Sequence, residues 1–169
     1  VKHSPITSGI RRPLTRHIFT SDASLKGWGW SYAGLHDHGA FPTSWTDYIG
    51  LHSKHKRGQV HALELWAVLQ GFRTLHKVWA TQNVRIKIDN QCGVSTLTRL
   101  LTRSHVAIPI LKEIALYSAV YDINPIFGFI GGRWNFIPDL LSRISIKSTD
   151  LSQLPLLLKQ SAKLADISQ

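Results

Sequence analysis

Alternating apolar and polar residues predict several β-strands in this chain. The segment RHIFTSDASLKGWGW, residues 16–30, predicts a strand that ends on Asp22, a turn at Ala23-Ser24 and a second strand that opens at Gly27. Residues 84–89 alternate apolar and basic side chains and again end on an aspartate. Two more strands are expected: an edge strand at 39–45 that contains Pro42 and follows a turn at 36–39, and a buried strand in the apolar run 123–130.

Apolar residues at spacings of three and four predict the helices. The strongest pattern, at residues 60–78, places Glu64 on the apolar stripe itself. A carboxylate there is costly to bury unless it is paired, protonated or bound to a metal. We also expect a basic loop at 46–59 and helices at 91–102, 109–121 and 136–143, with Asn90 and Asn135 as N-caps of the first and last of these three.

The order of these elements predicts an α/β fold with a mixed five-stranded sheet. Three antiparallel strands come first, two parallel strands follow, and helices cover both faces. Residues 16–143 are expected to form this domain. Residues 1–15, with two prolines and an arginine pair, predict an N-terminal linker or arm, and residues 144–169 predict a tail with an amphipathic helix at 154–167.

Charge and composition narrow the class of partner. The 169 residues include 20 Lys and Arg against 10 Asp and Glu, and the resulting charge of +10 favours a polyanion such as nucleic acid, with a solvated basic surface as the alternative. The single cysteine, Cys92, excludes an intrachain disulfide and indicates a reducing intracellular compartment, the cytoplasm or nucleus, with an organelle left open. No apolar run has the length of a membrane span. The lack of methionine suggests a piece of a longer polypeptide.

Four of the acidic residues stand at the ends of predicted elements or on an apolar face: Asp22, Glu64, Asp89 and Asp139. If the strands that carry Asp22 and Asp89 are parallel neighbours, both carboxylates emerge at the same edge of the sheet, and the two helical acids can approach them there. Clustered carboxylates repel one another unless cations intervene, and hard divalent cations prefer oxygen ligands. The pattern therefore predicts a metal site, and a two-metal site can hydrolyse a phosphodiester.

The four acids stand in four motifs: FTSDAS, HALELWAVLQGF, IKIDNQCGV and GGRWNFIPDLLSR. Together and in this order they resemble the ribonuclease H domains of reverse-transcribing retroelements, of the long-terminal-repeat or tyrosine-recombinase type. The resemblance implies a ribonuclease H-like fold and cleavage of the RNA strand of RNA–DNA hybrids within a reverse transcriptase polyprotein, joined to an upstream segment. It also implies two Mg²⁺ ions, with Mn²⁺ as a possible substitute, both bridged by Asp22. Glu64 and Asp89 would complete one metal site, and Asp139 would help to hold the other.

Further residues are candidates for contact with nucleic acid. By the resemblance, Asn90 and Gln91 would touch the minor groove of the hybrid, where 2′-hydroxyls distinguish RNA from DNA; helix capping is the alternative for both. Trp134 follows a Gly-Gly-Arg sequence beside the predicted metal site. Basic residues that would meet backbone phosphates, or simply be solvated, are Lys54, Lys56, Arg57, Arg99, Arg103 and Arg133.

Two departures from the family pattern leave alternatives open. Phe129 stands where many relatives carry a histidine that assists catalysis, and Pro138 stands where a small residue such as alanine is common. The leading alternative is thus a catalytically weak or inactive ribonuclease H-like module that serves nucleic-acid binding or assembly. A nuclease or transposase of the same superfold acting on DNA is disfavoured by the Leu-Ser-Arg ending. The oligomeric state is left open.

Overall fold

Five strands form one mixed sheet in the computed structural model, which describes residues 12–50 and 57–144. The strands are β1 (Leu14–Ala23), β2 (Trp28–Tyr32), β3 (Leu35–Gly39), β4 (Asn83–Ile88) and β5 (Asn124–Phe129). The helices are α1 (Thr43–Tyr48), α2 (Arg57–Trp79), α3 (Gln91–Arg99), α4 (Ala107–Val120) and α5 (Phe136–Arg143), with a short 3-10 turn at Gly132–Trp134.

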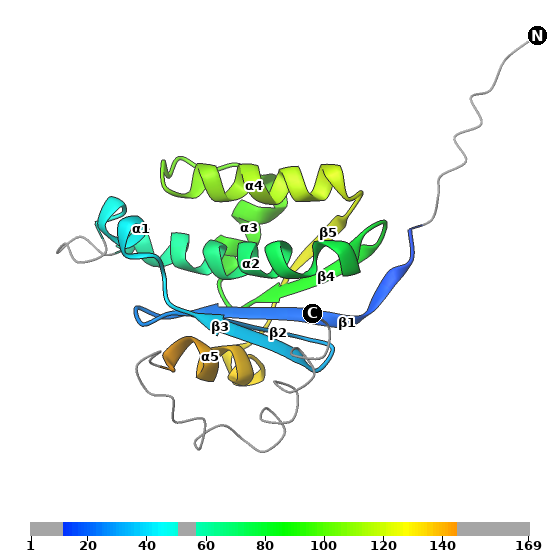
Figure 1. The fold of residues 1–169 in the computed structure, drawn as a ribbon, viewed down its shortest axis with the longest axis horizontal. Coiled ribbons are helices and arrows are strands. Elements are labelled where there is room, and N and C mark those ends of the chain that lie inside the picture. Colours follow the sequence, from blue (N-terminus) through cyan, green and yellow to red (C-terminus); the bar gives the residue numbers. More distant parts are fainter. Residues whose placement is uncertain (1–11, 51–56, 145–169) are drawn as a thin grey trace, which may run out of the picture.

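The strand order in the sheet is β3-β2-β1-β4-β5. β1 pairs antiparallel with β2 and parallel with β4, and β5 is parallel to β4. Helices α2, α3 and α4 lie on one side of the sheet and α5 lies on the other (Figure 1). The predicted fold class is confirmed: three antiparallel strands, two parallel strands and helices on both faces. None of the helices in the described ranges has the length and apolar character needed to cross a membrane.

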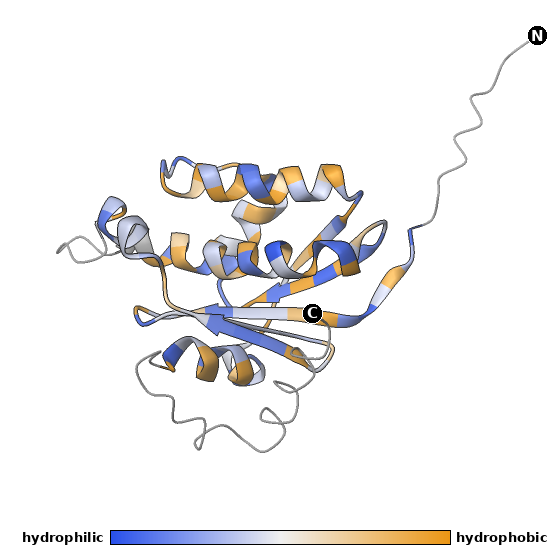
Figure 2. Cartoon of the chain, viewed as in Figure 1, coloured by the Kyte–Doolittle hydropathy of each residue, from blue (hydrophilic) through white to orange (hydrophobic). Residues whose placement is uncertain are grey.

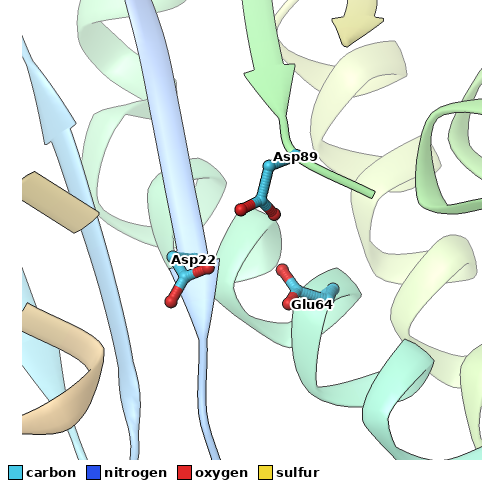
Figure 3. A group of neighbouring side chains, drawn as sticks. All are labelled: Asp22, Glu64 and Asp89. Carbon is cyan, nitrogen blue, oxygen red and sulfur yellow. The ribbon is translucent and has the colours of Figure 1, made fainter. Parts of the chain in front are cut away.

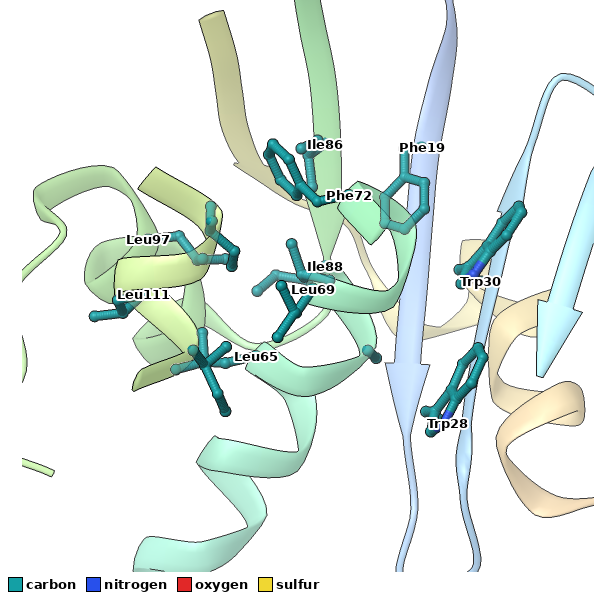
Figure 4. Close-up of a cluster of buried hydrophobic side chains, with 14 of the residues drawn as sticks. Phe19, Trp28, Trp30, Leu65, Leu69, Phe72, Ile86, Ile88, Leu97 and Leu111 are labelled. Atoms are coloured by element: carbon teal, nitrogen blue, oxygen red, sulfur yellow. The ribbon is translucent and has the colours of Figure 1, made fainter. Parts of the chain in front are cut away.

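The core lies between the sheet and α2. Phe19 of β1 packs edge-on against Trp79 of α2, with ring centroids 5.2 Å apart, and Trp28 and Trp30 of β2 face the same side (Figure 4). A Cβ atom on Gly71 would lie 2.3 Å from the Phe19 ring, so α2 can approach β1 this closely only with glycine there. Both apolar and polar residues occur along α2 and α4 (Figure 2), and apolar residues such as Leu69 and Ile114 are buried in the core.

The hairpin between β2 and β3 differs from the prediction. Residues 36–39, predicted as a turn, all lie in β3, and the turn is instead Ala33-Gly34, whose φ angles of 54° and 82° suit a two-residue hairpin. The strand predicted at 39–45 is wrong, because Pro42 directly precedes α1, which also occupies the start of the predicted loop. The third strand is nevertheless an edge strand, as predicted, although Pro42 lies outside it.

The last strand also differs from the prediction. β5 was expected to be buried, but it is the other edge of the sheet, and its residues are exposed or only partly buried. Of its apolar residues, Phe127 packs against the core while partly buried, and Ile126 and Phe129 are exposed. The predicted helix at 91–102 ends earlier, because Leu100 adopts a left-handed conformation with φ of 50°. The helix predicted at 136–143 is confirmed as α5. β1 begins at Leu14, within the predicted arm, and the predicted helix at 154–167 lies outside the described residues.

Candidate metal centre

The side chains of Asp22, Glu64 and Asp89 come together at one end of the neighbouring strands β1 and β4 (Figure 3). Asp22 lies near the end of the central strand β1, Asp89 follows the last residue of β4, and Glu64 reaches across from α2. One carboxylate oxygen from each residue lies within 4.8 Å of the other two. Since β1 and β4 are parallel neighbours, the predicted convergence of Asp22 and Asp89 is confirmed, and Glu64 joins them from the covering helix.

Asp139 lies close to this group but is not a member of it. It stands in the first turn of α5, on the opposite face of the sheet from α2. Its charge raises the pKa values of Asp22 and Asp89, which places it within electrostatic range of both. Its side chain is partly exposed and bound by Arg143. The structure therefore brings three of the four predicted acids into one cluster and leaves the fourth beside it.

Burial and mutual repulsion favour the protonated forms of these acids. The pKa of Glu64 is raised to about 9 by its burial and then by the charges of Asp22 and Asp89. The pKa of Asp22 is raised to about 6, mainly by burial, against the opposing effect of a hydrogen bond from Ser142. Burial also raises the pKa of Asp89, and a hydrogen bond from Asn135 opposes this.

The donor set fits a hard divalent cation. Oε2 of Glu64 is buried and has no hydrogen-bond partner among the described residues, an arrangement that costs free energy unless something else occupies that position. All three ligands are carboxylate oxygens, which Mg²⁺ and Mn²⁺ prefer. A cation bound among them would also offset the repulsion between the three carboxylates.

Two residues of the site were not predicted. Ser142, buried in α5, donates a hydrogen bond from its hydroxyl to Oδ2 of Asp22 at 2.6 Å. Asn135 was predicted as an N-cap, but its side chain makes no capping bond and instead donates to the backbone oxygen of Ser21 at 3.0 Å. The sequence offered one indication of Ser142: it lies on the same face as the apolar residues of a helix that also carries Asp139, a candidate metal ligand.

Comparison with solved structures identifies the fold. No protein-family model and no curated protein sequence matches the chain. Ribonuclease H1 from the archaeon Halobacterium salinarum matches with a TM-score of 0.50 at 11% identity, over 74% of this chain and 91% of that one. The LC11 ribonuclease H1 isolated from compost matches with a TM-score of 0.50 at 12% identity, over the same shares of the two chains. This chain has a ribonuclease H-like fold. At such low sequence identity, the structural matches establish the fold alone. Activity and substrate have to be argued from the site.

On this ribonuclease H-like fold, the residues after β4 open a helix beside the carboxylates. Asn90 is the N-cap of α3, and its side chain accepts a hydrogen bond from the backbone N–H of Gly93 at 3.1 Å. The capping role is therefore confirmed, while its predicted contact with nucleic acid stays a prediction. Gln91 is the first residue of α3 and is exposed.

The other predicted nucleic-acid contacts lie in several places. Arg99 ends α3 and Arg103 follows it, and both are exposed. Arg133 and Trp134 are exposed in the turn before α5. Lys54 and Lys56 lie outside the described residues, as does the side chain of Arg57. Phe129, the predicted histidine position, is 47% exposed at the end of β5, where it is paired with Ile88 next to Asp89.

Proposed function

We propose that this domain is a metal-dependent endoribonuclease that cleaves the RNA strand of RNA–DNA hybrids. The observation that carries the proposal is the convergence of Asp22, Glu64 and Asp89 from three separate parts of the fold. Within residues 12–50 and 57–144, a buried carboxylate oxygen of Glu64 has no hydrogen-bond partner. The ribonuclease H-like fold supports the same reaction class, because two solved structures with this fold are ribonucleases H1.

The carboxylates define what the chain contributes to the reaction. Two divalent cations, Mg²⁺ or Mn²⁺ as a substitute, would activate a water and stabilise the leaving oxygen of an in-line displacement. Asp22, on the central strand, would bridge the two positions, Glu64 and Asp89 would complete one, and Asp139 would help to hold the other. The rigid strands β1 and β4 fix two of these ligands before substrate arrives, which is the preorganisation that such a site needs.

The substrate follows from charge and from the exposed residues around the site. A formal charge of +10 favours binding of a polyanion. Asn90 and Gln91 lie immediately after Asp89, where they would reach the minor groove of a hybrid, and Arg133 and Trp134 lie just before α5. Arg99 and Arg103 would contact phosphates farther along the duplex. We also propose that the domain is part of an intracellular reverse transcriptase polyprotein, because its four acidic motifs resemble those of retroelement ribonuclease H domains.

The test is cleavage of labelled RNA–DNA hybrid, duplex DNA and duplex RNA, each with Mg²⁺ or Mn²⁺. Asp22→Asn and Asp89→Asn are compared with Asp47→Asn, which changes an exposed acid on α1. We expect hybrid-specific cleavage by the wild type and by Asp47→Asn, and none by the two site variants, with folding of each verified by circular dichroism. Cleavage of duplex DNA in preference to the hybrid would contradict the proposed substrate.

The second candidate is a module with the same fold that binds nucleic acid with little or no cleavage. Phe129 favours it, because a phenyl ring at the exposed end of β5 cannot transfer a proton. Tight binding of the hybrid without cleavage in either metal would establish this candidate in place of the enzyme.

A further inference from the structure

Ser142 makes a polar contact to the proposed metal ligands from the far side of the sheet. It is fully buried in α5, and its Oγ lies 2.6 Å from Oδ2 of Asp22 and 3.0 Å from the backbone oxygen of Asp139. A hydroxyl has one proton to donate. The carboxylate is the nearer acceptor, and hydrogen bonds to an ionised oxygen are shorter and stronger than those to a neutral carbonyl.

We propose that Ser142 is a positioning residue for the metal centre: it fixes the orientation of the Asp22 carboxylate that would bridge the cations. This inference rests on the proposed function. Ser142 is the side-chain hydrogen-bond donor to Asp22 within the described part of the chain, and it engages Oδ2. The other carboxylate oxygen of Asp22, Oδ1, does not take part in this hydrogen bond. A carboxylate held in this way does not have to lose rotational freedom when a cation binds.

The position of Ser142 is itself set by close packing of α5 on β2. A Cβ atom on Gly29 would lie 2.5 Å from Cβ of Leu141 and 3.0 Å from the backbone nitrogen of Ser142, so glycine is needed for this approach. Ser24, in the turn after β1, donates its hydroxyl to the backbone oxygen of Ser142 at 2.6 Å. The residue is thus held through its backbone from one side while its side chain reaches Asp22.

A serine elsewhere in the same fold provides a matched control. Ser118 of α4 donates its hydroxyl to the backbone oxygen of Ile114 at 2.9 Å, within its own helix. Ser118→Ala therefore removes a helical serine hydroxyl, as Ser142→Ala does, without touching a carboxylate. A purely local effect of losing a serine hydroxyl would be the same in both variants.

The experiment measures Mn²⁺ binding to the metal-free full chain by calorimetry, together with hybrid cleavage as a function of Mg²⁺ concentration. We expect Ser142→Ala to weaken Mn²⁺ binding by about tenfold or more, the usual effect of removing an outer-shell partner, and to raise the Mg²⁺ requirement in parallel. Ser142→Thr keeps the hydroxyl and should restore most of the affinity, whereas Ser142→Cys, a weak donor of similar size, should not. Ser118→Ala should bind Mn²⁺ as the wild type does.

The outcomes separate this inference from the proposed function. If the wild type neither binds Mn²⁺ nor cleaves the hybrid, the proposed function fails. If the wild type does both and folded Ser142→Ala binds Mn²⁺ equally well, only the positioning role is overturned. Should the alanine variant not fold, the comparison of the threonine and cysteine variants decides, and equal Mn²⁺ affinity in those two overturns the positioning role.

Discussion

Arg143 binds Asp139 through a single oxygen. Its Nε and Nη2 atoms donate to Oδ1 of Asp139 at 2.8 and 2.6 Å, one helical turn apart on α5. The two side chains are 63% and 43% exposed, so the pair lies at the surface beside the buried carboxylates. The acid that would hold the second metal is therefore engaged by an arginine, and Arg143 also competes electrostatically with any cation bound nearby.

Replacement of Arg143 by alanine tests this competition. Exposed ion pairs contribute at most about 1 kcal/mol, so the free energy of unfolding in urea should change little. The affinity for Mn²⁺ should rise by up to about fivefold, because Asp139 no longer has to give up an ion pair of about 1 kcal/mol to bind the cation. Arg73→Ala, which removes a similar two-bond pair with Glu113, is the control and should leave Mn²⁺ affinity unchanged. Weaker Mn²⁺ binding by Arg143→Ala would show that the arginine orients Asp139 for the metal instead.

The raised pKa of Glu64 predicts how stability depends on pH when no metal is bound. The ordinary pKa of 4.5 rises to about 9 in the folded chain, so between these values the unfolded chain has lost the proton that the folded chain keeps. Stability must therefore fall as pH rises through this interval. Glu64→Gln removes this titration, so it should make the profile shallower and stabilise the chain at about pH 8, while the raised pKa values of Asp22 and Asp89 keep a smaller slope.

Urea unfolding in a chelator at several pH values measures this effect. Glu113→Gln, on α4, is the control and should keep the wild-type slope. Added Mn²⁺ should stabilise the wild type most at high pH, where metal and proton no longer compete for Glu64. A wild-type profile as flat as that of Glu64→Gln would contradict the assignment of a protonated Glu64 to the metal-free fold.

Gly29→Ala tests the close approach of α5 to β2. The added methyl would lie 2.5 Å from Leu141, so α5 must shift, at a cost of about 1–3 kcal/mol in the free energy of unfolding. The shift should also weaken Mn²⁺ binding, because it moves Ser142 away from Asp22. Gly128→Ala, on β5, is the control, since its nearest neighbour, a side-chain carbon of Lys87, would be 3.9 Å away. Equal stability of the two alanine variants would mean that α5 accommodates the methyl without moving.

Phe129→His tests whether a missing proton carrier limits turnover. Phe129 is 47% exposed, so the substitution should change the free energy of unfolding by about 0.5 kcal/mol or less. If the step that a histidine would assist is rate-limiting, turnover on the hybrid should rise by about tenfold or more. Ile126→His places the same side chain on the same strand at an equal 47% exposure, and it should not change turnover. Unchanged turnover in folded Phe129→His would remove the missing histidine as the explanation of a slow rate.

Sequence patterns located most of the site because its ligands stand at the ends of regular elements. Asp22 and Asp89 follow alternating strands, and Glu64 interrupts the apolar stripe of a long helix, so each was visible as a carboxylate in an unusual local setting. The bounds of α5 were predicted correctly, because Asn135 directly precedes the helix and Pro138 lies in its first turn. The hairpin turn was missed because the positive φ angles of Ala33 and Gly34 are decided by the pairing of β2 with β3.

The sequence by itself predicted the α/β class, the order of the elements apart from α1, and four acids that would meet if β1 and β4 were neighbours. The tertiary structure decided that they are neighbours, that β5 is an exposed edge and that Asp139 lies outside the cluster with Arg143. It alone revealed the bond between Ser142 and Asp22, which are 120 positions apart in the chain. Local patterns reflect the periodicity of one helix or strand, whereas such a contact depends on how closely two elements pack, and here that is set by the missing side chain of Gly29.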